Sequence, residues 1–306
     1  MAPPEEKPYR LGFSDSESQA CRRLIEIGLA EDLDAGGDIT TIALVEESAH
    51  GEAAIVSRDH GVLAGLPAAQ AVFSTVDSSI IVQPRKADGE ILRAGDVVAV
   101  VCGPVRSLLS SERLALNFLT HLSGVATLTS RFVAAVANTR CQVYDTRKTH
   151  PGWRLLEKYA VRQGGGHNHR VGLYDAVLIK DNHLAQWSSA HRTARARSVA
   201  DAVRHARAAF PAARFVEVEV DTLDQLRDAL AGNPDLVLLD NMQPDMLRQA
   251  VDLRDQRATG VILEASGGIS LKNAAAIAAT GVDRISIGAL TQSPPALDIG
   301  MDWKAS

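Results

Sequence analysis

Residues 215–240 read FVEVEVDTLDQLRDALAGNPDLVLLD, which places a helical stretch at 222–231 between two β-rich runs. The second run, DLVLLD, is apolar almost throughout, as expected of a parallel strand that is buried on both faces. A strand, a helix and another strand in this order predict a right-handed β-α-β unit. The segment therefore predicts a parallel sheet that is covered by helices.

The same alternation extends over residues 142–289. The further β-rich runs are QVYDTR, AVLIK, VILEAS and RISIGA, and helices are expected at 153–162, 192–209, 222–231, 244–256 and 271–279. Six strands that alternate with helices favour an α/β barrel, complete or incomplete, over an open sheet. The GxGxxG fingerprint is absent, so the sequence gives no support for dinucleotide binding.

The part of the chain before residue 142 has a different pattern. A helix is expected in SESQACRRLIEIGLAEDL, with Ser14 or Ser16 as its cap. Residues 51–105 hold short β-rich runs between DG and AGD turns, which predict a small β-containing domain with local hairpins. Residues 107–137 return to a helical pattern. A chain of 306 residues is long for one domain and natural for two.

The composition argues against several classes of protein. Apolar residues make up 46% and charged residues 23%, as in an ordinary globular protein. No uninterrupted apolar run reaches the ~18 residues of a membrane span. The net charge of −5 argues against a nucleic-acid coat, and the basic segment 191–197 is only a weak sign of such binding. The three cysteines lie far apart and indicate neither a disulfide framework nor a zinc site. The first ten residues lack a signal-peptide pattern, so a cytoplasmic location is expected.

A cationic segment follows the first of the six strands. Residues 144–183 read YDTRKTHPGWRLLEKYAVRQGGGHNHRVGLYDAVLIKDNH. Between residues 146 and 180, seven Lys or Arg and two acids give a charge of +5 in a chain of −5, so the rest carries −10. A cationic island in an acidic protein indicates an anion-binding site. The three glycines at 164–166 would let the backbone approach a ligand closely.

Polar residues and glycines stand at the C-terminal ends of the expected strands, where α/β folds place their chemistry. They are Arg147, Lys148, Lys180, Glu219, Asp240, Ser266, Gly267, Gly268 and Gly288. The glycine turns could present backbone N–H groups to a phosphate at the start of a helix. Carboxylates among so many cations indicate a bound divalent metal, Mg²⁺, that bridges a polyphosphate. The site is therefore expected to bind a phosphorylated substrate and a second anion.

Structural interpretations stay open for some of the polar residues. Glu217 and Glu219 share the face of FVEVEV that must meet water, cations or ligand, but Glu217 could be an ion-pair partner inside the barrel. Asp240 could simply cap a turn with Asn241. A solvated helix face is the favoured interpretation for Arg154, Lys158 and Arg162. Ordinary loop histidines are favoured over metal ligands for His150 and His167.

Several motifs together resemble a known family. They are DTRKTHPGWRLLEKYAVRQGGGHNHR, LIKDNH, VEVEVD, LLDN, LEASGGIS and SIGALT. In order and spacing they resemble the quinolinate phosphoribosyltransferases, also called carboxylating nicotinate-nucleotide pyrophosphorylases. DLDAGGDITT and SSERLALNFLTHLSGVAT resemble the same family, so the resemblance extends from about Glu31 to Thr291.

The resemblance implies a fold and a reaction. The fold is an N-terminal α/β sandwich domain over residues 1–116, joined by the chain end at 293–306, and an incomplete, open α/β barrel over residues 117–292. The reaction takes quinolinate and phosphoribosyl pyrophosphate, with Mg²⁺, to nicotinate mononucleotide, CO₂ and pyrophosphate, an entry step to NAD. The resemblance also implies a homodimer in which one subunit completes the site of the other.

Roles for individual residues are implied by the same resemblance. The quinolinate carboxylates would meet Arg147, His169, Arg170 and Lys180, and Arg113 would reach into the neighbouring subunit's site. Phosphoribosyl pyrophosphate and its metal would be handled by Lys148, Glu219 and Asp240, with the two acids as metal ligands. The 5′-phosphate would be held by Ser266, Gly267, Gly268 and Gly288, and Thr146 would belong to the substrate-binding set.

Two other functions remain as alternatives. A related phosphoribosyltransferase that acts on another heterocyclic acid would have no need of a residue set built for two carboxylates. A non-catalytic sensor of quinolinate or phosphoribosyl pyrophosphate is expected to lack Lys148, Glu219 or Asp240, and all three are present. The basic stretch SSAHRTARAR at 188–197 is longer than the family pattern leads us to expect, and we interpret it as a surface elaboration.

Overall fold

The computed structural model describes residues 13–189 and 198–303. Most of the basic stretch at 188–197 therefore lies outside the described residues. The chain forms two compact units. The barrel unit contains the described residues of 131–147 and 167–288, and the sandwich unit contains residues 13–130, 148–166 and 289–303.

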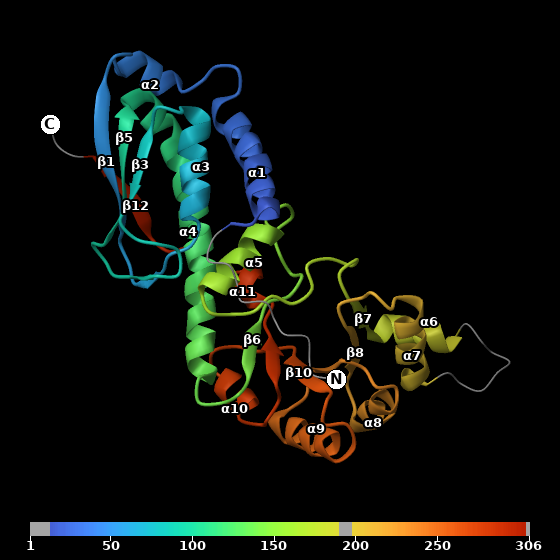
Figure 1. Ribbon diagram of the computed structural model, residues 1–306. Helices are drawn as coiled ribbons and strands as arrows, with labels where there is room; N and C mark the ends of the chain where they lie inside the picture. The colour runs from blue at the N-terminus through green and yellow to red at the C-terminus, as the bar shows by residue number, and fades with distance from the viewer. Residues whose placement is uncertain (1–12, 190–197, 304–306) are drawn as a thin grey trace. The chain divides into compact units, whose positions relative to one another are not determined.

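Six parallel strands form the sheet of the barrel unit (Figure 1). They are β6 Gln142–Tyr144, β7 Val177–Ile179, β8 Val216–Val220, β9 Leu236–Asp240, β10 Ile262–Ser266 and β11 Arg284–Ser286. Their order is β6-β11-β10-β9-β8-β7. Strands β7 to β11 thus lie side by side in chain order, β6 pairs with β11, and the sheet is open between β6 and β7. The prediction of an α/β fold with a parallel sheet in incomplete-barrel order is confirmed, with all six strands where the sequence placed them.

The helices of the barrel unit connect successive strands. They are α6 Asp181–Ser189, α7 Val199–Ala209, α8 Leu223–Ala231, α9 Pro244–Arg257 and α10 Ala274–Ala278. Ser198 caps α7 in a capping box with Asp201, and the Thr222 side chain caps α8. The sequence did not predict α6. Helix α10 begins later than the expected residue 271, because the Asn273 side chain accepts the Ser270 N–H at 2.7 Å and holds a turn there.

The sandwich unit contains a four-stranded antiparallel sheet and a two-stranded ribbon. The strands are β1 His50–Ser57, β2 Gly61–Val62, β3 Ile81–Pro84, β4 Ile91–Leu92, β5 Val97–Pro104 and β12 Ile299–Trp303. The larger sheet has the order β12-β1-β5-β3, and β2 pairs with β4. The expectation of local hairpins is wrong, because among the described residues no strand of this unit pairs with its immediate neighbour along the chain. Strand β12, near the chain end, pairs with β1.

The helices of the sandwich unit are α1 Asp15–Leu33, α2 Ile39–Leu44, α3 Leu66–Val76, α4 Val105–Val136, α5 Arg154–Gln163 and α11 Ala289–Gln292. Ser14 caps α1 in a capping box with Glu17, as the sequence allowed. Helix α4 passes through residues 116–117, where a domain boundary was expected, without a break. Among the described residues, no helix has the length and apolar content to cross a membrane.

Helix α5 is buried, and this corrects the interpretation of a solvated basic face. Lys158 is only 1% exposed. The Arg162 guanidinium donates to Glu17 of α1 at 2.6 Å. The ring of Phe13 meets that of Tyr159 edge to face, with 4.6 Å between the centroids. The charged side chains of α5 were misassigned because the sequence does not show that α1 covers this helix.

The glycines after α5 serve packing. A Cβ on Gly164 would lie 2.3 Å from the Ala126 carbonyl oxygen of α4, and one on Gly166 would lie 2.7 Å from the Thr129 side chain. The turn therefore rests directly on α4 and leaves no room for side chains at either position. The expectation that these glycines open the backbone to a ligand has no support in these contacts.

Candidate active site at the strand ends of the barrel

The predicted strand-end residues of the barrel unit lie along one edge of the sheet. Tyr144 is in register with Ser286, Ser286 with Ser266, and Ser266 with Asp240. Val220 of β8 pairs with Leu239, the residue before Asp240. Because the strands are parallel, the residues that follow them gather at this edge. The sheet thus brings together the polar residues that follow β6 to β11.

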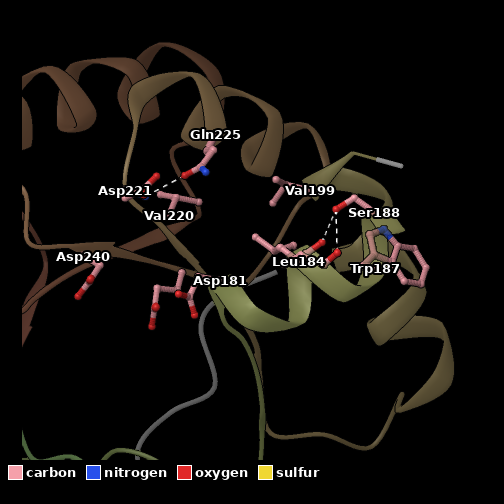
Figure 2. A pocket seen from close by; sticks show the side chains of 11 residues that line it. Asp181, Leu184, Trp187, Ser188, Val199, Val220, Asp221, Gln225 and Asp240 are labelled. Carbon is pink, nitrogen blue, oxygen red and sulfur yellow. Dashed lines mark hydrogen bonds between the residues drawn. The ribbon is translucent and has the colours of Figure 1, made fainter. Parts of the chain in front are cut away.

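Four carboxylates line a pocket at the ends of β7, β8 and β9 (Figure 2). They belong to Asp181, Glu219, Asp221 and Asp240. Glu219 and Asp240 were predicted from the sequence, whereas Asp181 and Asp221 were not. Asp181 and Asp221 follow β7 and β8 within two residues, so the strand-end rule could have found both.

The carboxylates of the pocket differ in their partners. Glu219 is an ion-pair partner of Lys180, whose side chain is 46% exposed against 12% for Glu219. The Asp240 carboxylate accepts a hydrogen bond from the Asn241 side-chain amide at 2.8 Å, which agrees with the turn-capping interpretation. The Asp221 N–H donates to the Gln225 side chain at 2.9 Å. The ammonium group of Lys180 therefore lies beside one of the four carboxylates of the pocket, that of Glu219.

Oxygen ligands such as these suit Mg²⁺, which is usually bound by one or two carboxylates, several waters and substrate phosphates. Within the described residues, only two groups of three His, Cys, Asp or Glu side chains bring their ligating atoms within 4.8 Å of one another. Neither group includes Glu219 or Asp240. The pocket therefore fits an ion that is held through few direct protein contacts, and not an all-protein cage.

The turn after β10 has the conformation that glycine permits. Gly267 has φ +90° and Gly268 φ +60°. A Cβ on Gly267 would lie 2.2 Å from the Asn241 side-chain oxygen, whereas one on Gly268 would have no atom within 4 Å. Backbone at Gly268 thus faces open space at the strand ends. The nearby helix α10 has only five residues, so the expected helix N-terminus contributes little.

Two arginines supply positive charge beside this edge. Arg147 is partly exposed, but its Nε is buried and has no hydrogen-bond partner among the described residues. Arg170 is buried and donates through Nη1 to the Ala176 carbonyl at 3.0 Å. Burial and then the charge of Arg147 lower the pKa of Arg170. The two guanidinium groups repel one another electrostatically, as expected of a pair that receives an anion.

Beneath this edge lies a buried cluster of opposite charges. His169 Nε2 lies 2.9 Å from Glu217 and 3.5 Å from Glu264, and Arg284 Nε lies 3.0 Å from Glu264. The Arg284 guanidinium also stacks over the Tyr144 ring, 4.4 Å from its centroid. Glu217 is fully buried, so the interpretation of Glu217 as an ion-pair partner inside the barrel is confirmed.

The cluster holds two carboxylates against one permanent cation. Burial, followed by the charge of Glu217, raises the pKa of Glu264. Burial opposes a charge on His169, but Glu264 and Glu217 outweigh it and raise its pKa. His169 Nδ1 accepts a hydrogen bond from the backbone N–H of Arg170 at 2.8 Å, which disfavours a second proton on the His169 ring. The cluster therefore holds a proton to higher pH than a free carboxyl group would.

The remaining predicted site residues are divided between the two units. Thr146 follows β6 in the barrel unit, and Gly288 is the last residue of that unit. Lys148 and Arg113 belong to the sandwich unit, where both are exposed. The Lys148 carbonyl accepts a hydrogen bond from the Thr291 hydroxyl at 2.7 Å. The barrel unit thus contains every predicted site residue except these two.

Comparison with known proteins accounts for almost the whole chain. The family "Quinolinate phosphoribosyl transferase, C-terminal domain" matches residues 125–302, and the corresponding N-terminal domain matches residues 38–123. The nicotinate-nucleotide pyrophosphorylase [carboxylating] of Mycobacterium leprae is 47% identical over 292 residues, which are 95% of this chain and 99% of that protein. A probable nicotinate-nucleotide pyrophosphorylase of Bacillus subtilis is 41% identical over 92% of both chains.

Solved structures agree with the sequence comparison. The nicotinate-nucleotide pyrophosphorylase of Francisella tularensis superposes with a TM-score of 0.87 at 37% identity, and covers 97% of this chain and 100% of its own. The resemblance noted in the motifs is therefore confirmed over both units. This chain belongs to the quinolinate phosphoribosyltransferase family.

Proposed function

We propose that this protein transfers the 5-phosphoribosyl group of phosphoribosyl pyrophosphate to the ring nitrogen of quinolinate. The 2-carboxylate leaves as CO₂, and the products are nicotinate mononucleotide and pyrophosphate, a step in NAD biosynthesis. The observation that carries this proposal is the family match over both domains, with relatives of that activity aligned over nearly the whole chain. The cations and carboxylates at the barrel edge are the groups that this reaction requires.

The quinolinate subsite would be formed by the cationic residues of the barrel edge. Quinolinate carries adjacent carboxylates, and planar guanidinium groups bind carboxylates through two parallel hydrogen bonds. Arg147 supports this role because its buried Nε has no partner among the described residues. Arg170, Lys180 and His169 complete the proposed set, with Thr146 beside Arg147.

The phosphoribosyl pyrophosphate subsite would use the carboxylate-lined pocket and the glycine turns. Glu219 and Asp240 would hold Mg²⁺, with Asp181 and Asp221 in the same pocket wall. The ion, when bound, neutralises charge on the leaving pyrophosphate. Lys148 would contact the same pyrophosphate. Ser266, Gly267, Gly268 and Gly288 would hold the 5′-phosphate, and the open space at Gly268 supports that placement.

The chemistry follows from these positions. The quinolinate nitrogen forms a bond to ribose C1 while the bond from C1 to the pyrophosphate oxygen breaks. Positive charge develops on the ribose, and nearby carboxylates stabilise it. The ring nitrogen is then cationic and accepts the electron pair released when the 2-carboxylate leaves. Because the ring itself accepts the electron pair, binding, orientation and exclusion of water suffice for the loss of CO₂, and no dedicated base for decarboxylation is needed. Carbon 2 takes a proton from solvent after CO₂ has left.

A homodimer with a shared site belongs to this proposal. Arg113 would enter the partner subunit's site and add a cation for quinolinate. Its exposure on α4 leaves it available for such a contact. The cytoplasmic location expected from the sequence also stays a prediction.

One assay tests the proposal. The purified protein is mixed with quinolinate, phosphoribosyl pyrophosphate and Mg²⁺, and nicotinate mononucleotide and CO₂ from the labelled 2-carboxylate are followed together. Matched formation of both products, abolished by EDTA, is the expected result. Binding of both substrates without product would favour the sensor. Failure to bind quinolinate would favour a phosphoribosyltransferase for another heterocyclic acid.

A further inference from the structure

Three side chains of the sandwich unit converge outside the site described above. They are His121 of α4, His150 of the turn before α5, and Glu157 of α5. Glu157 Oε1 lies 2.9 Å from His121 Nε2 and 2.6 Å from His150 Nδ1. The Glu157 side chain is fully buried, and the potential ligand atoms of the three residues all lie within 4.8 Å of one another.

We propose that His121, His150 and Glu157 form a binding site for a divalent transition metal of the Zn²⁺ class. Two imidazole nitrogens and one carboxylate oxygen are the protein ligands of many three-ligand zinc sites, which keep a fourth position for water. Imidazole nitrogen also separates this site from the proposed Mg²⁺ site, because Mg²⁺ and Ca²⁺ prefer oxygen ligands.

Only a small movement is needed to admit the ion. Zinc–ligand bonds of about 2.0–2.1 Å in a tetrahedron place neighbouring ligand atoms about 3.4 Å apart. The two nitrogen–oxygen distances of 2.9 and 2.6 Å would therefore have to lengthen by less than about 1 Å. The two imidazole nitrogens, which lie within 4.8 Å of each other, would have to approach by no more than about 1.4 Å. In the metal-free protein the imidazoles donate to Glu157, so hydrogen bonds hold the ligands close together before the metal arrives.

The surroundings orient the ligands. The backbone N–H of His150 donates to the other Glu157 oxygen, Oε2, at 3.2 Å. This hydrogen bond fixes the carboxylate with Oε1 toward the imidazoles. The Trp153 ring packs edge-on against the His121 ring, with 5.1 Å between the centroids. Such outer contacts strengthen metal sites. The His150 side chain is 51% exposed, which gives an ion access from solvent.

The position of His150 links this site to the proposed reaction. Lys148 lies two residues earlier, and its carbonyl is fixed by Thr291 at 2.7 Å. The Thr149 hydroxyl accepts Arg154 Nε at 3.0 Å. These hydrogen bonds restrain the turn, so a metal that displaces His150 would also displace Lys148. We expect this displacement to slow turnover in the proposed reaction. This consequence rests on the proposed function, whereas metal binding does not.

The test is calorimetric titration of tag-free, chelator-treated protein with Zn²⁺ in excess Mg²⁺. We expect one ion per chain with a Kd in the micromolar range or below. His150→Gln and Glu157→Gln should each weaken binding at least about tenfold. His60→Gln, a change of an exposed histidine in the same unit, should leave binding unchanged. Co²⁺ should give the visible absorption of a tetrahedral complex in the wild type and not in Glu157→Gln.

Two results would overturn the site. One is the absence of stoichiometric Zn²⁺ binding by a wild-type protein whose thermal unfolding is cooperative. The other is binding that both His150→Gln and Glu157→Gln retain, since the ion would then lie elsewhere. His150→Gln alters a half-exposed side chain, so its fold should persist even if Glu157→Gln is destabilised. The activity assay is separate, and an inactive protein that binds Zn²⁺ would reject the proposed reaction and keep the site.

Discussion

At the scale of single residues, a change at Arg147 tests whether quinolinate binding depends on the charge of this side chain or on the planar shape of its guanidinium group. Arg147→Lys keeps the positive charge and removes the planar fork that suits a carboxylate. We expect KM for quinolinate to rise roughly 10- to 100-fold, the equivalent of about 1.5–3 kcal/mol for a charge-assisted hydrogen bond. KM for phosphoribosyl pyrophosphate should change much less. Steady-state kinetics with each substrate varied in turn measures the difference.

Arg140 provides the matched control for this change. It precedes β6, whereas Arg147 follows it, and its side chain is 64% exposed beside Asp283. Arg140→Lys should leave both KM values unchanged. If the two variants raise KM for quinolinate equally, or if Arg147→Lys acts equally on both substrates, Arg147 has no special role for quinolinate.

The proton in the buried cluster of His169, Glu217, Glu264 and Arg284 gives a second test. A raised folded-state pKa at Glu264 stabilises the protein below the unfolded-state pKa, and this contribution is lost as pH rises through the folded-state value. The raised pKa of His169 acts in the same direction. Glu264→Gln imitates the protonated acid, so its Tm should fall less than that of the wild type toward alkaline pH.

Thermal unfolding at a series of pH values from acid to alkaline measures this difference. Glu90→Gln, at an exposed position of the sandwich unit, is the control and should follow the wild type. A constant difference in Tm between Glu264→Gln and the wild type at every pH would show that Glu264 does not carry the proton.

The strand-end residues could be predicted because strand periodicity alone indicates where each strand stops. Alternation along FVEVEV also separated the face that carries Glu217 and Glu219 from the apolar face. The partner of Glu217 could not be predicted in this way. His169 and Glu264 are 48 residues below and 47 residues above Glu217 in the chain, and only the folded sheet brings them into contact.

At the scale of elements, the turn after α5 depends on its contact with α4. Gly164→Ala would place a Cβ 2.3 Å from the Ala126 carbonyl oxygen, a backbone atom that cannot move aside cheaply. We expect a loss of about 2–4 kcal/mol in the free energy of unfolding. Gly36→Ala is the control, because a Cβ there has no atom within 4 Å.

Urea denaturation of the two variants provides the measurement, with the midpoint shifted for Gly164→Ala and nearly unchanged for Gly36→Ala. Equal midpoints would mean that α4 and the turn adjust to each other, and the packing explanation of the glycine run would fail. The three glycines were predicted to serve a ligand because a sequence does not show which helix lies behind a loop.

Elements were predictable where the local signal was strong and unopposed. The β-rich runs of the barrel and helix α1 have clear periodicity or a capping box. Helix α3, LPAAQAVFSTV, was missed because it is short, largely buried and flanked by β-rich runs. The position of α5 was right and its exposure was wrong, because amphipathic charge patterns do not reveal a covering helix such as α1.

At the scale of the whole molecule, the two units are built from interleaved segments. The chain leaves the sandwich unit after residue 130, returns for residues 148–166, leaves again, and ends in the sandwich unit after residue 288. No linker marks these passages, and the first lies within α4. Composition along the chain therefore does not mark the passages between the units, although the secondary-structure patterns on either side of them differ.

The shared site makes a quantitative prediction for the oligomer. If Arg113 of one subunit acts in the partner subunit's site, an Arg113→Ala chain paired with a Lys148→Ala chain contains one site with neither defect and one with both. Equal co-expression with random pairing makes half of the dimers mixed, so activity should recover to about a quarter of the wild-type value. Each variant alone should be nearly inactive, since each removes a cation that we propose to contact an anionic substrate.

The mixed sample distinguishes a shared site from two independent sites because only the shared site can restore an intact set of residues. If Arg113 acted within its own subunit, every site in the mixture would carry one defect and activity would stay at the level of the single variants. Glu112→Gln, next to Arg113 on α4, replaces Arg113→Ala in the control mixture and should alone retain activity. Sedimentation of the mixture must show dimers, because a monomeric wild type with full activity would remove the need for a partner's Arg113 altogether.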